Sequence, residues 1–427
     1  MTAVWRRDWF VLGAPFVVAL SLRLLYVLSR YTPELGAFEF GDYPSYAFAA
    51  RFWLQAGTFA SDLFLVRPPA FPVLIALLGE DKLAVLLVNC ALGALIASLT
   101  ALLCLVAFKA RAVSLLAGMI VALDPAGVVY SAFLAPEPLA NLSLAVMIVC
   151  LYIGVTRKAW LWLGLAGVAL SASMLARPAA YLLWLPLTVL IGLFAWRQRR
   201  LWIGLALFAL LSGGAMAAWI AHNARVFNHA TFSTIGVYTM LYYRAAMLER
   251  LATGADIETV YARLAERVEA RLARPLPEGV DIAGARFTHF AATPEMSAAM
   301  TEVAFEVFRR YPHLYLLTVP LGLARMYGHT QPLSGIWSAL DVLWNIGLVA
   351  LSAVGVLLLW RHQQRLLVGM TLLIGVYFTI GALLVKTTAI DTRERSMLTP
   401  LLACCAAYAL SWLKRQKARA QRYDESS

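Results

Sequence analysis

The sequence predicts an all-α, polytopic transmembrane helical protein with about ten membrane spans. Of its 427 residues, 61% are hydrophobic and only 14% are charged, and the mean hydropathy is +0.73. Soluble domains carry about 25% charged residues. Apolar runs of about 17 to 25 residues recur along the chain, and each is long enough to cross the roughly 30 Å hydrocarbon core of a bilayer. Together these observations exclude a soluble globular domain.

The positions of basic clusters fix the orientation of the predicted spans. The spans cover residues 9–29, 82–108, 112–131, 139–155, 159–175, 181–196, 201–221, 338–360, 366–386 and 396–413. Arginine and lysine cluster at alternate connections, at positions 6–7, 109–111, 157–158, 197–200, 361–365 and 414–422. The positive-inside rule places these clusters and both termini in the cytoplasm. The formal charge of +12 is therefore a topology signal, and nucleic-acid binding is disfavoured because no basic stripe or aromatic platform is present.

This pattern divides the chain into three parts. Residues 1–221 hold seven spans and a large outer loop, 30–81. Residues 222–337 form an external helical cap region, and residues 338–427 add three spans and a basic cytoplasmic tail. Segment 313–328 is apolar but short, and Pro320 and Arg325 interrupt it, so we expect an interfacial or re-entrant helix there. No internal repeat is visible, which disfavours the inverted-repeat architecture of secondary transporters.

The external region predicts two amphipathic helices. After Asp256, a typical N-cap residue, apolar side chains recur every three or four positions, at Ile257, Val260, Leu264, Val268 and Leu272. The second helix begins at Thr293-Pro294-Glu295, which combines a cap residue, a proline at the first helical position and an acid in the first turn. We therefore expect a small helical cap on the outer membrane face.

Cysteine and histidine usage predicts neither a disulfide framework nor a metal centre. The five cysteines lie inside predicted spans and are typical of apolar packing: Cys90, Cys104, Cys150, Cys404 and Cys405. His222 and His229 lie on the outer side but are not spaced for one helical face. We expect no cofactor and no bound metal, with a divalent metal as the less favoured alternative.

Charged side chains near the outer ends of the spans are the candidate functional residues. Burying a charge near the hydrocarbon core of the membrane is costly. Each such residue is therefore functional, part of a structural ion pair, or a side chain that reaches to the membrane–water interface. In the ten-span topology these residues all fall on or near the same side: Glu39, Asp42, Arg67, Asp124, Glu137, Arg177, His222, Arg225, Arg244, Arg393 and Arg395. Their convergence predicts a charged site at the outer face.

Asp42 is the strongest candidate for a catalytic base. Gly41 precedes it and Pro44 follows it, and a carboxylate in such a turn can take a proton from a hydroxyl group. The alternative is a structural N-cap, because a helix is predicted directly after Asp42. Glu39 shares this role or raises the pKa of Asp42 as a neighbouring charge.

Arg67 is the candidate ligand for a phosphate group. The two prolines after it hold the backbone extended, and a planar guanidinium can bind phosphate in a bidentate way. The alternative is a contact with lipid headgroups. Glu137 and Arg177 stand at two further outer turns, where Glu137 could instead serve the N-terminus of a helix. Asp124 precedes Pro125 and is expected to line a helix break.

Several ordered motifs resemble those of the polytopic GT-C glycosyltransferases. D-x-x-x-Y (Asp42, Tyr46) opens the first outer loop, and AGTF (56–59) and RPPAFPVLIALLG (67–79) follow. Later motifs are DPAGVVYSAFLAPEPL (124–139), ARPAAYLL (176–183), HNARVFNHATFST (222–234) and RERSMLTPLLA (393–403). More narrowly, the chain resembles the protein O-mannosyltransferases and lipid A aminoarabinose transferases, which use polyprenyl-phosphate sugars.

The resemblance implies roles for particular residues. Asp42 matches the first-loop aspartate that acts as base, and Arg67 takes the place of the basic residue before proline that contacts the carrier phosphate. The usual Asp-Glu pair of the first loop is Asp42-Tyr43 here, which disfavours a two-carboxylate or metal-assisted scheme. Tyr43 and Tyr46 are expected to pack on the sugar, and Arg393 or Arg395 to help with the phosphate.

The implied function is that of an inverting glycosyltransferase at the outer face of the inner (plasma) membrane. It would move a hexosyl or pentosyl group from a polyprenyl-phosphate donor to a hydroxyl group of a glycan, lipid or protein acceptor. The alternatives are a lipid-linked sugar flippase or transporter, a ligase or polymerase that moves a whole glycan, and a structural subunit of a cell-envelope complex.

Overall fold

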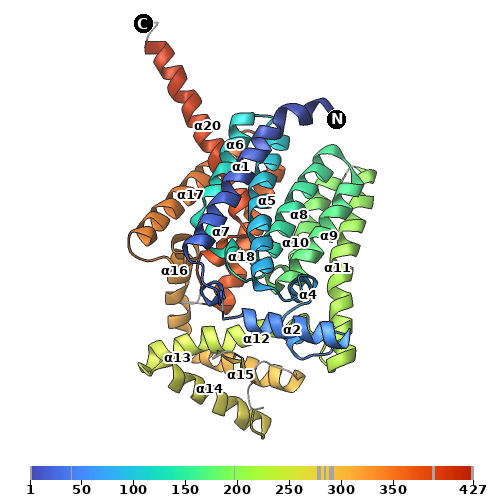
Figure 1. Ribbon diagram of the computed structural model, residues 1–427, viewed down its shortest axis with the longest axis vertical. Coiled ribbons are helices and arrows are strands. Elements are labelled where there is room, and N and C mark those ends of the chain that lie inside the picture. Colours follow the sequence, from blue (N-terminus) through green and yellow to red (C-terminus); the bar gives the residue numbers. More distant parts are fainter. Residues whose placement is uncertain are drawn as a thin grey trace.

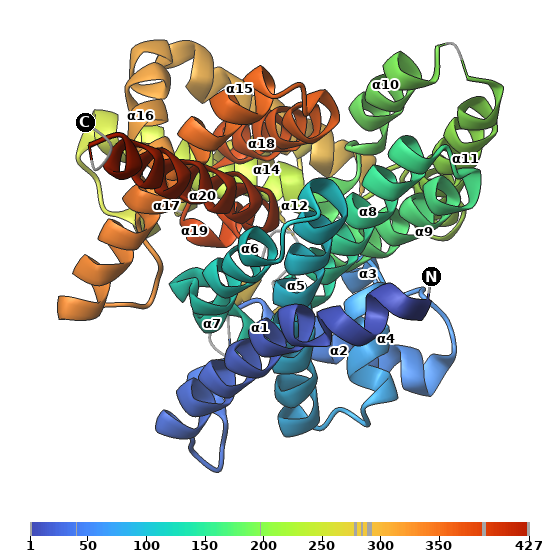
Figure 2. The ribbon, with the colours of Figure 1, turned by 90° about the horizontal axis from the view of Figure 1, so that it is seen from above.

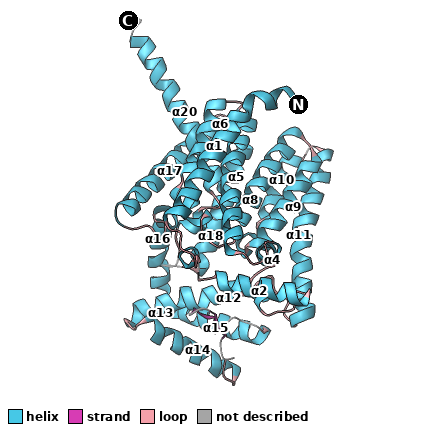
Figure 3. Ribbon diagram, in the orientation of Figure 1, coloured by secondary structure: helices cyan, strands magenta, loops and turns pink. Residues whose placement is uncertain are grey.

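The computed structural model shows a bundle of long helices with a smaller helical cap at one end. It describes residues 2–39, 41–196, 198–276, 280–282, 285–287, 293–386 and 390–424. The N- and C-terminal helices reach the end of the bundle opposite the cap (Figure 1). Nearly all the described chain is helical (Figure 3), as the predicted fold class requires.

A helix occupies each of the ten segments predicted to span the membrane. The bundle consists of α1 (Thr2–Ser29), α5 (Lys82–Phe108), α6 (Arg111–Leu123), α7 (Pro125–Ser131), α8 (Glu137–Arg157), α9 (Trp160–Ala176), α10 (Trp184–Ala195), α11 (Arg199–Phe227), α17 (Gly335–Arg361), α18 (Arg365–Val385) and α20 (Thr399–Asp424). Among the described residues, seven helices are long and apolar enough to cross a membrane, and α6 with α7 makes an eighth span if the bent pair is counted as one. The protein is therefore a multi-pass membrane protein.

The bend between α6 and α7 has a local cause. The two helices meet at Asp124 with an angle of 55°. Pro125 lacks an amide hydrogen and cannot continue α6, and Asp124 accepts a hydrogen bond from the Gly127 amide (3.0 Å), which caps α7. The break brings the Asp124 carboxylate into the interior of the bundle, where it is fully buried.

Residues 30–81 fold into short helices across the end of the bundle that faces the cap. They are η1 (Gly36–Phe38), α2 (Tyr43–Ala56), α3 (Leu63–Val66) and α4 (Ala70–Leu77). Helix α2 ends at Gly57, whose φ of 66° is a left-handed conformation that glycine adopts without steric cost. Figure 1 shows α2 lying nearly at right angles to the long helices. This loop carries both Asp42 and Arg67, so its fold decides whether they meet.

The cap contains both helices predicted from the sequence. It consists of α12 (Ile235–Tyr238), the π-helix η3 (Thr239–Ala245), α13 (Ala246–Thr253), α14 (Ile257–Leu272), a hairpin of β1 (Val280–Ile282) and β2 (Ala285–Phe287), and α15 (Pro294–Arg310). Asp256 caps α14 and Thr293 caps α15 through their side-chain oxygens, so both predicted helix starts are confirmed. The cap has its own apolar core, which includes Leu264, Met300 and Val303.

The C-terminal helices pack beside the N-terminal ones rather than forming a separate layer. Helix α16 (Pro312–Gly328) leads from the cap to α17 beside the bundle (Figure 1). Seen along the bundle, α20 lies beside α6 and α17, while α9, α10 and α11 form the opposite side (Figure 2). The short helices η2 (Pro178–Ala180) and α19 (Thr392–Arg395) complete the fold. Helix α19 contacts both α7 and α18, which places its charged residues at the centre.

We predict that the cap is external and that the turn between α17 and α18 is cytoplasmic. A cysteine at Ala262, on the exposed face of α14, should react with a membrane-impermeant maleimide added outside intact cells, whereas a cysteine at Gln363 should react only after permeabilisation. The five native cysteines are buried and provide a low background. Labelling of position 363 from outside would contradict the ten-span topology and make 313–328 a full span.

Candidate active site

Asp42 and Arg67 form an ion pair at the end of the bundle that faces the cap. Arg67 Nη2 lies 2.7 Å from Asp42 Oδ1, and Arg67 Nε donates to Ser45 Oγ at 3.0 Å. Asp42 stands at the N-cap position of α2, but its side chain accepts no hydrogen bond from the amides of that helix. The structure therefore contradicts the N-cap alternative, because the carboxylate points to Arg67 instead.

Tyr46 supports the guanidinium group of Arg67 from one side. The Arg67 Cζ atom lies 4.8 Å from the centre of the Tyr46 ring, which is a cation–π contact. The same ring packs edge-on against Phe71, at 5.1 Å between centroids. Tyr46 is 2% exposed and Tyr43 is 3% exposed. The structure therefore leaves neither ring face open to a sugar, and Tyr46 instead holds Arg67 in place.

A second guanidinium group, that of Arg393, contacts the other oxygen of Asp42. Arg393 Nη2 lies 3.5 Å from Asp42 Oδ2, and Arg393 Nε lies 2.6 Å from Glu137 Oε1. Both oxygens of the Asp42 carboxylate therefore face arginine. About a third of the Asp42 side chain (31%) stays exposed, so the carboxylate remains within reach of a ligand.

The charged chain continues from Glu137 into the C-terminal half. Arg177 Nε lies 3.4 Å from Glu137 Oε1, and Arg177 Nη2 lies 2.8 Å from Glu394 Oε2. Lys386 Nζ lies 2.5 Å from the other oxygen of Glu394. The side chains alternate in sign, so each carboxylate lies between two cations. Glu137 and Arg177 therefore belong to the same chain of ion pairs as Asp42.

Arg395 pairs with Asp124 deeper in the bundle. Arg395 Nη2 lies 2.8 Å from Asp124 Oδ1, and both side chains are completely buried. Trp344 Nε1 donates to the same oxygen at 3.1 Å. This pair lies beside the Asp42 site, and its arginine is occupied by Asp124 rather than facing Asp42.

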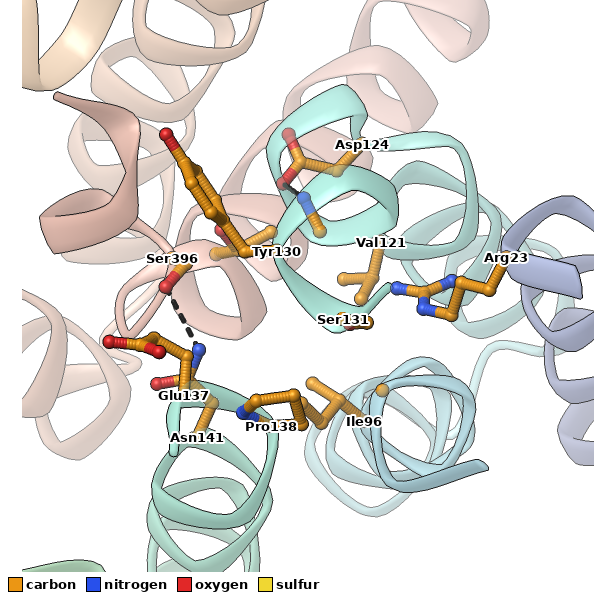
Figure 4. Close-up of a pocket in the computed structure, with 13 residues that line it drawn as sticks. Arg23, Ile96, Val121, Asp124, Tyr130, Ser131, Glu137, Pro138, Asn141 and Ser396 are labelled. Atoms are coloured by element: carbon orange, nitrogen blue, oxygen red, sulfur yellow. Dashed lines mark hydrogen bonds between the residues drawn. The ribbon is translucent and has the colours of Figure 1, made fainter. Parts of the chain in front are cut away.

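A small cavity lies beside Asp124, between α1, α5, α7 and α8. Its volume is about 20 Å³, enough for roughly one water molecule. Arg23 enters it from α1 and Glu137 and Asn141 from α8, and Asn141 donates to Ser396 Oγ at 2.9 Å (Figure 4). Glu137 Oε2 and Arg23 Nε have no hydrogen-bond partner within the described part of the chain. A bound water there would satisfy such groups.

Neighbouring cations lower the pKa values of the carboxyl groups Asp42 and Glu394. Burial alone would raise the pKa of Asp42, but Arg67 and Arg393 together hold that pKa well below its usual range. Glu394 behaves in the same way, because Arg177 and Lys386 outweigh its burial and lower its pKa. Both groups are therefore ionised at neutral pH.

Opposite charges are balanced around the site. The described residues supply six cations (Arg23, Arg67, Arg177, Lys386, Arg393 and Arg395) and six carboxyl groups (Asp42, Asp124, Glu137, Asp341, Asp391 and Glu394). Burial, and then the charge of Glu394, raises the pKa of Asp391. Arg67 and Arg393 are the two guanidinium groups that face the partly exposed Asp42 carboxylate.

Other sequence candidates lie apart from Asp42. Glu39 forms an ion pair with Lys82, so its carboxylate is directed away from Asp42. His222 stacks on Trp219, at 5.0 Å between ring centroids, near the C-terminus of α11. Arg225 is exposed, and Arg244 is buried within the cap. These side chains support the surrounding structure rather than the ion-pair chain.

Sequence reasoning missed Lys386, Glu394 and Trp344, which all contact site residues. The one signal was the alternation Arg393-Glu394-Arg395 between two apolar segments. Successive charges of opposite sign on a short outer turn predict several partners in different directions. Within the described residues, no group of three or more His, Cys, Asp or Glu side chains is arranged to hold a metal ion.

No protein-family profile and no curated protein matches this chain. Solved structures, in contrast, are similar to it. The apo crystal structure of the oligosaccharyltransferase of Archaeoglobus fulgidus is similar, with a TM-score of 0.58 and 14% identity, over 99% of this chain and 52% of that one. A structure of the archaeal oligosaccharyltransferase AglB from the same organism, in complex with an inhibitory peptide and a dolichol-phosphate, gives a TM-score of 0.55 and 13% identity over the same shares.

These similarities define the class of fold. Both structures have the GT-C glycosyltransferase fold, so this chain has that fold, as the resemblance of its motifs predicts. This chain spans about half the length of each of these proteins. At such low identity the comparison shows the fold alone.

We predict that Arg395 is essential for stability. Arg395→Met would leave the Asp124 carboxylate buried without its partner, and breaking a buried pair costs about 3–5 kcal/mol. The control is Arg51→Met, which breaks an exposed pair with Glu80 and should cost less than about 1 kcal/mol. Unfolding of the purified variants in detergent would measure both. Equal effects of the two substitutions would contradict the buried-pair assignment.

Proposed function

We propose that this protein is an inverting membrane glycosyltransferase that uses a polyprenyl-phosphate sugar and transfers the sugar to a hydroxyl acceptor at the outer membrane face. The observation that carries the proposal is the Asp42 carboxylate between Arg67 and Arg393. The candidate base and two candidate phosphate ligands lie together there, on a GT-C fold. The similarity to an enzyme solved with dolichol-phosphate supports a lipid-linked donor.

In the proposed reaction, Asp42 acts as the base and the two arginines bind the leaving phosphate. The acceptor hydroxyl attacks the anomeric carbon, and Asp42 takes its proton. The bond between the anomeric carbon and the phosphate oxygen breaks, and polyprenyl phosphate leaves with the electron pair. Arg67 and Arg393 stabilise the charge that grows on the phosphate. Because the leaving group is already a phosphate, no general acid is needed.

Donor binding would also change the pKa of Asp42. In the structure both of its oxygens face guanidinium groups, which makes the carboxylate a weak base. A phosphate that binds to Arg67 and Arg393 would compete for these same donors. The pKa of Asp42 would then rise toward its usual value, and the base would become active only when the donor is present.

The direct test measures the released carrier, because this product is the same for every sugar. The purified protein would be incubated with a panel of polyprenyl-phosphate sugars and a cell-envelope extract as the acceptor, and free polyprenyl phosphate would be measured by mass spectrometry. The size of the glycosylated product distinguishes transfer of one sugar from ligase or polymerase activity. Movement of donor across a vesicle membrane without release of carrier would instead indicate a flippase.

We predict that Asp42→Asn abolishes transfer while the protein still folds. An amide cannot take the proton, and loss of a positioned base costs at least about a hundredfold in rate. The matched control is Asp62→Asn, an exposed residue of the same loop whose side chain caps no helix. If the Asp42→Asn variant kept a tenth or more of the wild-type rate, Asp42 would not be the base.

We predict that Arg67 acts on the donor phosphate. Arg67→Ala should lose most activity and Arg67→Lys should keep part, because lysine supplies the charge without the planar fork. A charge-assisted hydrogen bond is worth roughly 1.5–3 kcal/mol, so the Ala variant should be about ten- to more than a hundredfold weaker. Titration of the donor checks this. Unchanged donor dependence with a raised acceptor requirement would move Arg67 to the acceptor side.

A further inference from the structure

A segment of the cap is fixed at both ends beside the Asp42 site. At its start, the Thr234 amide donates to the Leu65 carbonyl and Ser233 Oγ donates to the Val66 carbonyl, both at 2.8 Å. These carbonyls belong to the two residues that precede Arg67. The segment that follows, α12 with the π-helix η3, therefore begins next to the proposed phosphate ligand.

The far end of this segment is tied to the loop that leads to α19. Arg244 Nη1 donates to the Lys386 carbonyl at 3.1 Å, and Arg244 Nη2 donates to the Tyr315 carbonyl at 2.9 Å. The guanidinium also stacks on the Tyr315 ring at 3.8 Å. Lys386 is the partner of Glu394. Residues 235–243 thus connect the Arg67 side of the site to the α19 side, and the cap holds them in place.

Tyr243 is the aromatic residue of this segment that does not pack in the apolar core of the cap. Leu241, Tyr242 and Ala245 pack into the apolar core of the cap, whereas Tyr243 is outside that core and half-buried. Burial raises the pKa of Tyr243, and the charge of Asp42 raises it further, so the phenol is within electrostatic reach of the proposed base. Tyr243 lies in the π-helix η3, a helix type that is frequent at functional sites.

The rings of Tyr238 and Tyr243 lie side by side, and this pair is called the aromatic wall below. The Tyr238 ring lies next to Tyr243, at 5.9 Å between centroids and 75° between planes. The segment 235–243 has no charged side chain. The Tyr243 hydroxyl makes no hydrogen bond within the described residues, and it can both donate and accept. An aromatic face with one free hydroxyl matches a sugar ring, which has apolar C–H faces and hydroxyl groups at its edge.

We propose that Tyr243, with Tyr238 beside it, forms the acceptor subsite, and that the acceptor is a carbohydrate whose ring packs on this wall. This inference rests on the proposed function, since it places the attacking hydroxyl between Tyr243 and Asp42. A peptide acceptor would need partners for its backbone amide and carbonyl groups. The backbone of η3 uses its own groups within the helix and offers none.

The test separates acceptor binding from carrier binding in the full-length protein in lipid nanodiscs. Saturation-transfer NMR would report binding of a panel of methyl glycosides, and a serine- and threonine-containing peptide would serve as the competing class. Undecaprenyl phosphate would probe the donor side in a separate titration. Tyr243→Ala should weaken glycoside binding by about two- to tenfold, which is the usual value of one aromatic contact, and leave undecaprenyl phosphate binding unchanged.

Two variants control for damage to the cap. Tyr243→Phe keeps the ring and should retain most of the glycoside binding. Tyr311→Ala removes a tyrosine that packs against the cap core at the start of α16, and it should leave glycoside binding unchanged. Equal glycoside binding by the wild type and Tyr243→Ala, or binding of the peptide in place of glycosides, would overturn the acceptor assignment. Failure of the wild type to bind undecaprenyl phosphate would instead count against the proposed function.

Discussion

The pairing of buried charges is the constraint on which the rest of this structure depends. A charge taken out of water costs several kcal/mol unless an opposite charge and hydrogen bonds compensate it. Helix α19 meets this requirement with three successive residues, Arg393, Glu394 and Arg395. Successive side chains of a helix point about 100° apart, because a turn has 3.6 residues. One short helix therefore reaches Asp42, Arg177 and Asp124 in three directions.

This arrangement joins the two halves of the chain and also prepares the site for its chemistry. The proposed base and the proposed phosphate ligands hold one another in place before any substrate arrives, so the guanidinium groups that the donor phosphate would take over from Asp42 are already in position. The ring of Tyr46 packs on one face of the Arg67 guanidinium group. The extended backbone of Arg67, before Pro68, fixes the direction of the Arg67 side chain. Stability and reactivity therefore depend on the same contacts.

The parts of this site that local sequence determines were predictable, and the parts that depend on long-range packing were not. Both cap helices follow from their N-cap residues and apolar periodicity, and the meeting of Asp42 and Arg67 follows from one loop with a turn and an Arg-Pro-Pro sequence. The contacts of Glu394 depend on which helices pack together, and the position of Tyr243 depends on a π-helix, which has no signal in the apolar pattern. Tyr46 was expected to face a sugar, but the position of Phe71 turns its ring inward.

The ion pairs of α19 also bear on how the protein is made. Asp124 and Arg395 are 271 positions apart, and Glu137 and Arg393 are 256 positions apart. At about 5–20 residues per second, a ribosome needs roughly 15–50 s to cover that interval. During this time the N-terminal spans carry charges whose partners have not yet been synthesised. The nascent protein therefore depends on the translocon, chaperones or lipid headgroups to shield them, and chains that stop before α19 are natural targets for membrane quality control.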